Sequence, residues 1–322
     1  MRALVTGAGG FVGANLVRRL RDDGHDVHAT ARPGGDRKRL LGLTGATIHD
    51  VELDLPGAPG TLVADIAPEW IFHLAAHGAY SWQQDARQIC QANLLSTIEL
   101  ADAAERVGVE AFIHAGSSSE YGFKDHAPDE HERPEPNSTY AVAKTAATMY
   151  CSHRAREGKL PAATLRLYSV YGAMEDPRRL VSALLQHGLH GELPPLVAPE
   201  TARDFVYVED VCEALMLAAE KADEIAGEVY NVGSGRQTTL RELVDCVRAL
   251  LPIHAEPDWG SHAQRSWDTN IWCASTERAA HDLEWSATTS IEEGLTNTIA
   301  WMTARAAYDL RPARSPSHSH HG

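Results

Sequence analysis

The chain has 322 residues, a formal net charge of −15 and 43% hydrophobic residues. This length suits one large α/β domain or two lobes that share a core. The negative charge makes nucleic acid and anionic membranes poor partners, and no apolar run approaches the ~20 residues that cross a bilayer. Five scattered cysteines without a C-x-x-C pair, and a predicted strand that begins almost at Met1, predict a cytoplasmic protein with reduced thiols, no signal peptide and no bound metal.

Three glycines at fixed spacing stand near the start of the chain. Gly7, Gly10 and Gly13 lie between an apolar run at residues 3–5 and a helical pattern that begins at Phe11. In such a strand–turn–helix unit the first glycine reverses the chain, and the second lets the backbone approach a pyrophosphate. The third lets the helix pack closely on the strand. The pattern therefore predicts a dinucleotide site at the N-terminus of this helix.

Strand and helix patterns then alternate along the chain. Strands are predicted at 27–30, 70–74, 111–115, 163–167 and 228–232, and long helices at 89–107 and 140–156. This alternation predicts an α/β fold with a Rossmann-type doubly wound parallel sheet. We expect residues 1–167, with about 203–235, to form a dinucleotide-binding domain. Residues 168–202 and 236–310 would form a smaller C-terminal substrate-binding lobe, and 311–322 a disordered tail whose histidines belong to a solvated segment or a tag remnant.

A serine, a tyrosine and a lysine carry the chemistry. Tyr140 and Lys144 are one helical turn apart, so both project from one face of their helix. A nearby ammonium favours the phenolate, so we expect Lys144 to lower the pKa of Tyr140 and make it an acid/base at neutral pH. Ser117 follows the predicted strand 111–115, where its hydroxyl would bond a carbonyl oxygen beside the cofactor. These three residues are the predicted catalytic set.

In this order the motifs resemble the extended short-chain dehydrogenase/reductases that act on nucleotide sugars as epimerases, dehydratases and 4-keto reductases. The resemblance runs from Gly7 to about Trp301. It implies a nucleotide-sugar substrate and a homodimer formed through the two long helices. The cofactor-binding residues it implies are Gly7, Gly10, Phe11, Val12, Gly13, Arg32, Asp54, Leu55, Leu74, Ala75, Ala76, Asn93, Tyr140 and Lys144. The substrate-binding residues it implies are Ser118, Ser119, Ser169, Arg203 and Arg265, with the two arginines on the substrate diphosphate.

Three of the residues in these motifs have other interpretations. Asp54 could cap a helix instead of contacting adenine. Arg203 could pair with Asp204 at the surface. His73, in the motif that lines the cofactor cleft, is favoured as a packed core histidine over a catalytic group.

Departures from the family pattern bear on the reaction. The positions where 4,6-dehydratases usually carry acidic residues hold Ser118 and Ser119, and Glu120 comes one position late. Ser169 stands where many relatives have an asparagine that contacts the sugar nucleotide. The sequence therefore favours NADPH-dependent reduction of a 4-keto sugar nucleotide, with a C4 epimerase as the alternative. Dehydratase or decarboxylase chemistry, and a non-catalytic dinucleotide-sensing protein, are less favoured.

The end of the second strand bears on the cofactor. Ala31 occupies the place of the acid that bonds the ribose of NAD, and Arg32 follows it. We therefore favour NADP(H), with NAD(H) as a possible cofactor. In the second interpretation Arg32 stacks on adenine, residues 37–39 begin a solvated helix, and Asp36 caps that helix or serves NAD.

Overall fold

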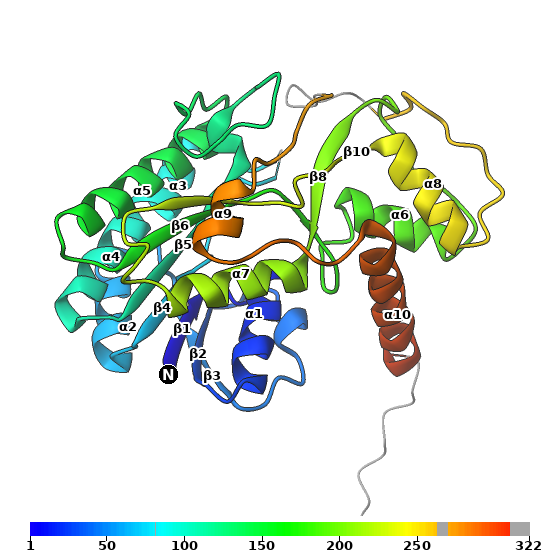
Figure 1. Cartoon of the computed structure of the whole chain (residues 1–322). Coiled ribbons are helices and arrows are strands. Elements are labelled where there is room, and N and C mark those ends of the chain that lie inside the picture. The colour runs from blue at the N-terminus through cyan, green and yellow to red at the C-terminus, as the bar shows by residue number, and fades with distance from the viewer. Residues whose placement is uncertain (81, 263–269, 310–322) are drawn as a thin grey trace, which may run out of the picture.

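The computed structural model describes residues 1–80, 82–262 and 270–309, and its centre is a seven-stranded parallel sheet (Figure 1). The strands run in the order β3-β2-β1-β4-β5-β6-β9, and every neighbouring pair is parallel. This is the Rossmann strand order with one strand added, so the predicted fold class is confirmed. The strands are β1 (Arg2–Thr6), β2 (Asp26–Ala31), β3 (Ala46–Asp50), β4 (Trp70–His73), β5 (Ala111–Ser117), β6 (Ala162–Leu167) and β9 (Val229–Val232).

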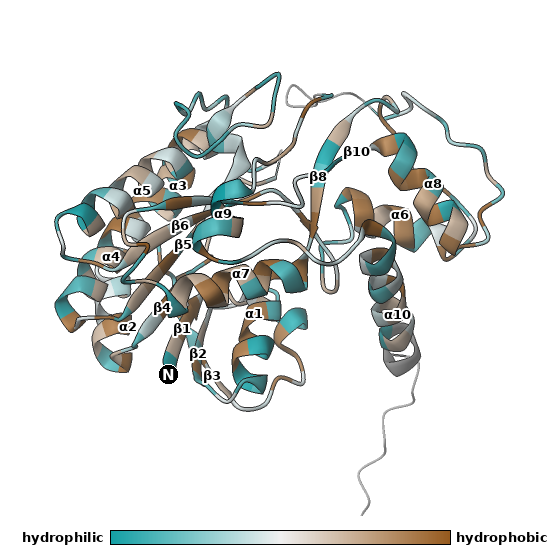
Figure 2. Ribbon diagram, viewed as in Figure 1, coloured by the Kyte–Doolittle hydropathy of each residue, from teal (hydrophilic) through white to brown (hydrophobic). Residues whose placement is uncertain are grey.

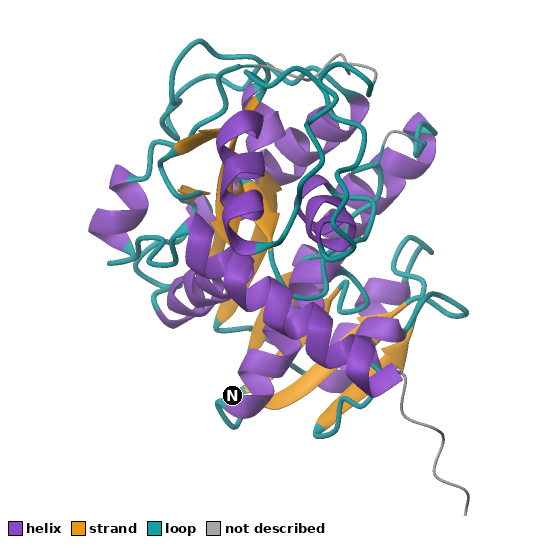
Figure 3. Ribbon diagram, turned by 90° about the vertical axis from the view of Figure 1, so that its right-hand side faces the viewer, coloured by secondary structure: helices purple, strands orange, loops and turns teal. Residues whose placement is uncertain are grey.

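Helices cover both faces of this sheet (Figures 1 and 3). One face packs on α1 (Phe11–Asp22) and α7 (Val208–Glu220), with α9 (Glu277–Asp282) beside them. The other packs on α2 (Ala58–Ile66), α4 (Ser96–Val107) and α5 (Thr139–Arg156). Figure 2 shows hydrophobic colouring along α7 and the neighbouring strands, as expected for strands buried on both faces.

The first predicted long helix has an interruption. Asp85 caps α3 (Ala86–Cys90), which continues through a π-helical turn, η2 (Gln91–Leu95), into α4. Such turns widen a helix by one residue and often occur at functional sites. The second predicted helix is continuous as α5, and the Ser138 hydroxyl caps it by accepting from the Ala141 N–H.

A smaller lobe extends from the carboxyl edge of the large sheet (Figure 1). Its three-stranded sheet contains β7 (Ser169–Tyr171), β8 (Ala202–Tyr207) and β10 (Gln237–Thr239), with β8 in the middle. The helices α6 (Leu180–Gly188), α8 (Leu240–Leu250) and α10 (Ile291–Asp309) complete its core. Within the stretch 203–235, β8 thus pairs in the small sheet, while α7 and β9 belong to the large one. The domain boundaries given above stay a prediction.

Within the described residues, no helix is long and apolar enough to cross a membrane. The predicted tail, 311–322, and Arg265 lie outside the described residues.

Candidate active site

The glycine motif forms a tight turn between β1 and α1. Gly7 has a φ of +70°, and a Cβ on it would lie 2.7 Å from the Ala75 nitrogen. A Cβ on Gly13 would lie 2.5 Å from the Gly7 carbonyl oxygen. Gly10 is the N-cap of α1 and offers no side-chain cap, so the first-turn N–H groups are open to an anion. This turn fits a dinucleotide pyrophosphate.

The loop after β4, which contains Leu74, Ala75 and Ala76, lies against the glycine turn. Asn93, in the π-helical turn, holds this loop in place. Its amide donates to the carbonyl oxygens of His77 (2.6 Å) and Ile89 (2.9 Å) and accepts from the His77 N–H (3.0 Å). Asn93 therefore fixes the position of the loop after β4, and its contact with the cofactor stays a prediction.

His73 lies in the core, as the sequence favours. Its ring bonds the hydroxyls of Thr6 (2.7 Å) and Thr97 (2.9 Å), and burial lowers its pKa to about 3. Because the Thr6 hydroxyl also accepts from the Ala75 N–H, this neutral histidine ties β1 and β4 to α4 beneath the cleft.

Acidic residues of the segment after β3 lie close to Arg32, which follows β2. β2 pairs with β3 so that Ala31 faces Asp50. The chain after β3 then brings the Glu52 carboxylate within 3.7 Å of the Arg32 guanidinium. A hydrogen bond with Asp54 raises the pKa of Glu52. The N-cap of α2 is Gly57, so Asp54 does not cap that helix. Leu55 is exposed beside it.

The basic residues at 37–39 also have protein partners. Arg37 pairs with Asp50, and Lys38 lies 4.0 Å from Asp36. Arg39 donates to the carbonyl oxygens of Met174 (2.7 Å) and Gly9 (3.3 Å), so it pins the glycine turn to the loop after β7. Each of these three cations therefore has a protein partner in the structure.

Ser117 and Tyr140 meet at the carboxyl end of β5, and Lys144 lies one turn along α5. Tyr140 is hydrogen-bonded to Ser117, but burial dominates and raises the pKa of the phenol. Burial also lowers the pKa of Lys144 to about 8. The Lys144 ammonium lies 3.4 Å from Nε2 of His114. Burial lowers the pKa of His114, so its neutral ring can accept a hydrogen bond from the ammonium. The expected lowering of the Tyr140 pKa by Lys144 is therefore not seen: burial raises that pKa, and Lys144 is not among the groups that shift it.

The turn after Ser117, η3 (Ser118–Tyr121), places some of its side chains at a pocket and others in the core. Ser118 is buried at the cleft and Ser119 is half-buried. The Ser117 hydroxyl accepts from the Ser119 N–H (3.2 Å). Glu120 points the other way, into the core, where it pairs with Arg166.

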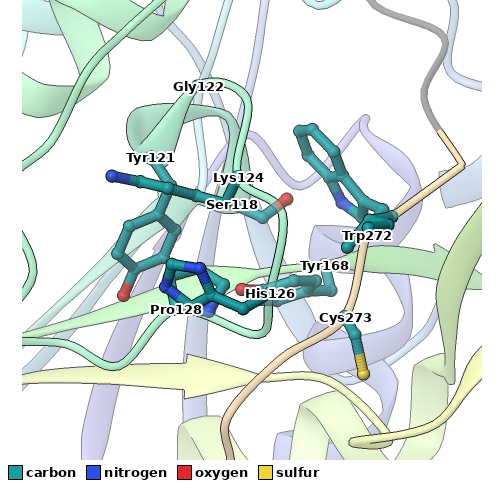
Figure 4. A pocket seen from close by; sticks show the side chains of 10 residues that line it. Ser118, Tyr121, Gly122, Lys124, His126, Pro128, Tyr168, Trp272 and Cys273 are labelled. Carbon is teal, nitrogen blue, oxygen red and sulfur yellow. The ribbon is translucent and has the colours of Figure 1, made fainter.

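A pocket opens beside this turn (Figure 4). Figure 4 shows Tyr168 between His126 and Trp272 in its wall. The Tyr168 hydroxyl is buried and has no partner among the described residues, so a ligand in the pocket meets an available hydrogen-bonding group. The pocket is lined by Ser118, Tyr121, Gly122, Lys124, His126, Pro128, Tyr168, Ile271, Trp272 and Cys273.

One predicted substrate residue lines this pocket, and two others lie near it. Ser118 lines it, and Ser169 follows Tyr168 at the start of β7. Arg203, on β8, places its guanidinium 5.5 Å from the centre of the Trp272 ring, at the far side of the wall. Of the predicted substrate contacts, these are the three that the structure places at or near the pocket.

Sequence reasoning missed Lys124, Tyr168 and Trp272. Tyr168 had a signal, because it directly follows β6 at the edge where ligands bind in such sheets. Trp272 reaches the pocket from a segment without a recognised motif. Among the described residues, no group of three His, Cys, Asp or Glu side chains is placed to hold a metal ion.

The Rossmann sheet, the uncapped glycine turn and the Ser–Tyr–Lys set together define a dinucleotide-dependent enzyme of the extended short-chain dehydrogenase/reductase type. Residues 3–233 match the NAD dependent epimerase/dehydratase family, and the chain belongs to that family.

Curated and solved relatives agree with this family. A UDP-glucose 4-epimerase of Mycolicibacterium smegmatis is 32% identical over 93% of this chain and 97% of its own. The structure of MoeE5 in complex with UDP-glucuronic acid and NAD is 32% identical with a TM-score of 0.83, and the match covers 95% of this chain and all of that one. A UDP-glucose 4-epimerase of Thermotoga maritima, solved with UDP-glucose, is 28% identical with a TM-score of 0.86 and the same coverage.

Proposed function

We propose that this protein is a nucleotide-sugar 4-epimerase that works with retained NAD. The observation that carries the proposal is the hydrogen bond between Ser117 and Tyr140, with Lys144 one turn along the same helix and serines at 118 and 119. Elimination needs an acid/base pair that these serines do not supply. The relatives described above support epimerase chemistry over the 4-keto reduction that the sequence favours.

The residues have distinct tasks in this reaction. Tyr140 removes the proton of the sugar 4-hydroxyl and later returns it, and Ser117 bonds the same oxygen as it becomes a carbonyl. Lys144, one helical turn from Tyr140, supplies a positive charge near the phenol. A bound NAD supplies reversible hydride transfer at C4, and its pyrophosphate would lie at the turn formed by Gly7, Gly10 and Gly13.

The proposal of NAD in place of the predicted NADP(H) rests on charge. A 2′-phosphate beside Arg32 would also meet Glu52, and Arg37 and Lys38 already pair with Asp50 and Asp36. The expected gain of a charge-assisted bond, ~1.5–3 kcal/mol, is therefore largely cancelled by like-charge repulsion. The two dissociation constants, measured on stripped protein, decide this. At least tenfold tighter binding of NADP(H) would restore the sequence-based prediction.

The reaction is tested with UDP-glucose and UDP-galactose in heavy water, without added cofactor. An epimerase interconverts them and leaves C4 free of deuterium, because the hydride returns to the same carbon. Tyr140→Phe should reduce turnover by ~10²-fold or more with little change in cofactor binding. Consumption of NADPH with a 4-keto sugar nucleotide and no interconversion would instead establish the reductase.

We also propose that the protein is a homodimer. On α5, Val142 is 50% exposed and Met149 is 64% exposed, and a spacing of seven places both on one side of the helix. Leu95, at the start of α4, is 45% exposed. A two-fold contact through α4 and α5 would bury this apolar face. Light scattering measures the outcome, and a monomer at micromolar concentration contradicts it.

A further inference from the structure

A buried ion pair lies directly behind the Ser117 turn. The Glu120 carboxylate is fully buried, and Nε of Arg166 on β6 donates to its Oε2 at 3.0 Å. The guanidinium also lies 4.5 Å from the centre of the Tyr121 ring. Apolar replacement of a buried pair is often neutral or stabilising, so stability alone is a weak reason for this one.

The same carboxylate joins the catalytic turn to the catalytic helix. Its Oε1 accepts from the Ser117 backbone N–H at 2.8 Å and from the Thr148 hydroxyl at 3.1 Å. Thr148 follows Lys144 by four residues, so it continues the face of α5 that carries Tyr140 and Lys144. The backbone makes room for the carboxylate, since a Cβ on Gly116 would lie 2.8 Å from Oε1.

The charge of Glu120 also acts on the reacting groups. It raises the pKa of Lys144 against the effect of burial and raises the pKa of Tyr140. The other titratable groups around Lys144 and Glu120 are His73 on β4, His114 on β5, Cys151 on α5 and Tyr121 on η3.

We propose that Glu120, held by Arg166, is a positioning residue that fixes the Ser117 turn against the face of α5 that carries Tyr140 and Lys144. The inference rests on the proposed function in one respect, that Ser117, Tyr140 and Lys144 are the reacting groups. It assigns a task to an acid that stands one position beyond the place where dehydratases use theirs and faces the core instead of the substrate.

The test is an NMR titration of protein with ¹³C-labelled lysine, which requires no turnover. The chain has five lysines, so a Lys144→Met spectrum assigns the signal. Glu120→Gln keeps an oxygen for the Ser117 N–H but removes the charge, and the midpoint of Lys144 should fall by about one pH unit or more. Thr148→Val is the matched control, because it removes a hydrogen bond on the same oxygen without changing the charge.

Glu120→Gln alone leaves Arg166 unpaired, so the double variant Glu120→Gln/Arg166→Gln guards against misfolding. It should show the same fall in midpoint with a melting temperature near that of the wild type. An unchanged Lys144 midpoint in both Glu120 variants, or an equal fall in Thr148→Val, overturns the proposal. A fall in the midpoint in a protein that does not interconvert sugars would refute the proposed function and leave this inference standing.

Discussion

Asp204 on β8 offers a quantitative test of how the smaller lobe is attached. Its carboxylate is fully buried and accepts from the Ser234 N–H (2.6 Å) and hydroxyl (2.7 Å), the Gly235 N–H (3.0 Å) and the Ala274 N–H (3.0 Å). It thereby fixes the segment that carries Trp272 and Cys273 to the pocket. Asp204→Ala should destabilise the protein and weaken substrate binding together.

The expected loss of stability follows from the backbone N–H donors that Asp204→Ala leaves without an acceptor. Three backbone N–H groups lose their acceptor, and each costs ~1–3 kcal/mol, partly offset because no buried carboxylate remains to be desolvated. The net loss is about 4 kcal/mol, which corresponds to a fall in Tm of roughly 10 °C. Thermal unfolding measures this value. Asp204→Asn keeps one acceptor oxygen and should lose about half as much.

A second buried carboxylate supplies the control for the binding effect. Asp210 accepts from the Thr288 hydroxyl (3.0 Å) and the Thr289 N–H (3.1 Å), in a segment that does not line the pocket. Asp210→Ala should lower Tm without raising KM, whereas Asp204→Ala should raise KM at least several-fold. A fall in Tm of less than ~2 °C for Asp204→Ala, or an equal rise in KM for both variants, would refute the reasoning.

Other perturbations address the cofactor turn and the helix face. Gly13→Ala places a methyl group 2.5 Å from the Gly7 carbonyl oxygen and should abolish NAD binding in calorimetry while the protein stays folded. Arg39→Met releases the glycine turn from the loop after β7 and should weaken NAD binding about tenfold. Lys38→Met is its control and should not change the dissociation constant. Met149→Asp adds a charge to the exposed face of α5 and should convert a dimer to a monomer in light scattering; an unchanged dimer would place the interface elsewhere.

Much of the fold was predictable because its signals are local. The glycine turn, the apolar runs of β4 and β5, and the spacing of Tyr140 and Lys144 each lie within a few residues of sequence. The strand β3 and helix α2 were not predicted, and no residue of β3 is fully buried, so β3 lacks the continuous apolar run of a central strand. The turn η2 was not predicted, since the sequence predicts one continuous helix over 89–107.

Site residues that belong to one short segment could be predicted from the sequence. Contacts between residues of distant segments could not. Glu52 approaches Arg32 only because β2 and β3 pair in a particular register. The partners of Glu120 come from α5 and β6, and Trp272 reaches the pocket from a segment about a hundred residues beyond Tyr168. The expected pKa of Tyr140 failed for a related reason, because the desolvation of a side chain depends on all of its neighbours.

The way the chain passes between its two sheets has a consequence for how specificity evolves. A single residue, Tyr168, separates β6 of the large sheet from β7 of the small one. After β8 the chain returns to the large sheet through α7 and β9, and it crosses again at β10, α9 and α10. No single genetic crossover can therefore transfer a substrate lobe from one relative to another. New sugar preferences on this scaffold have to arise by substitution and by changes in loop length within the interleaved segments.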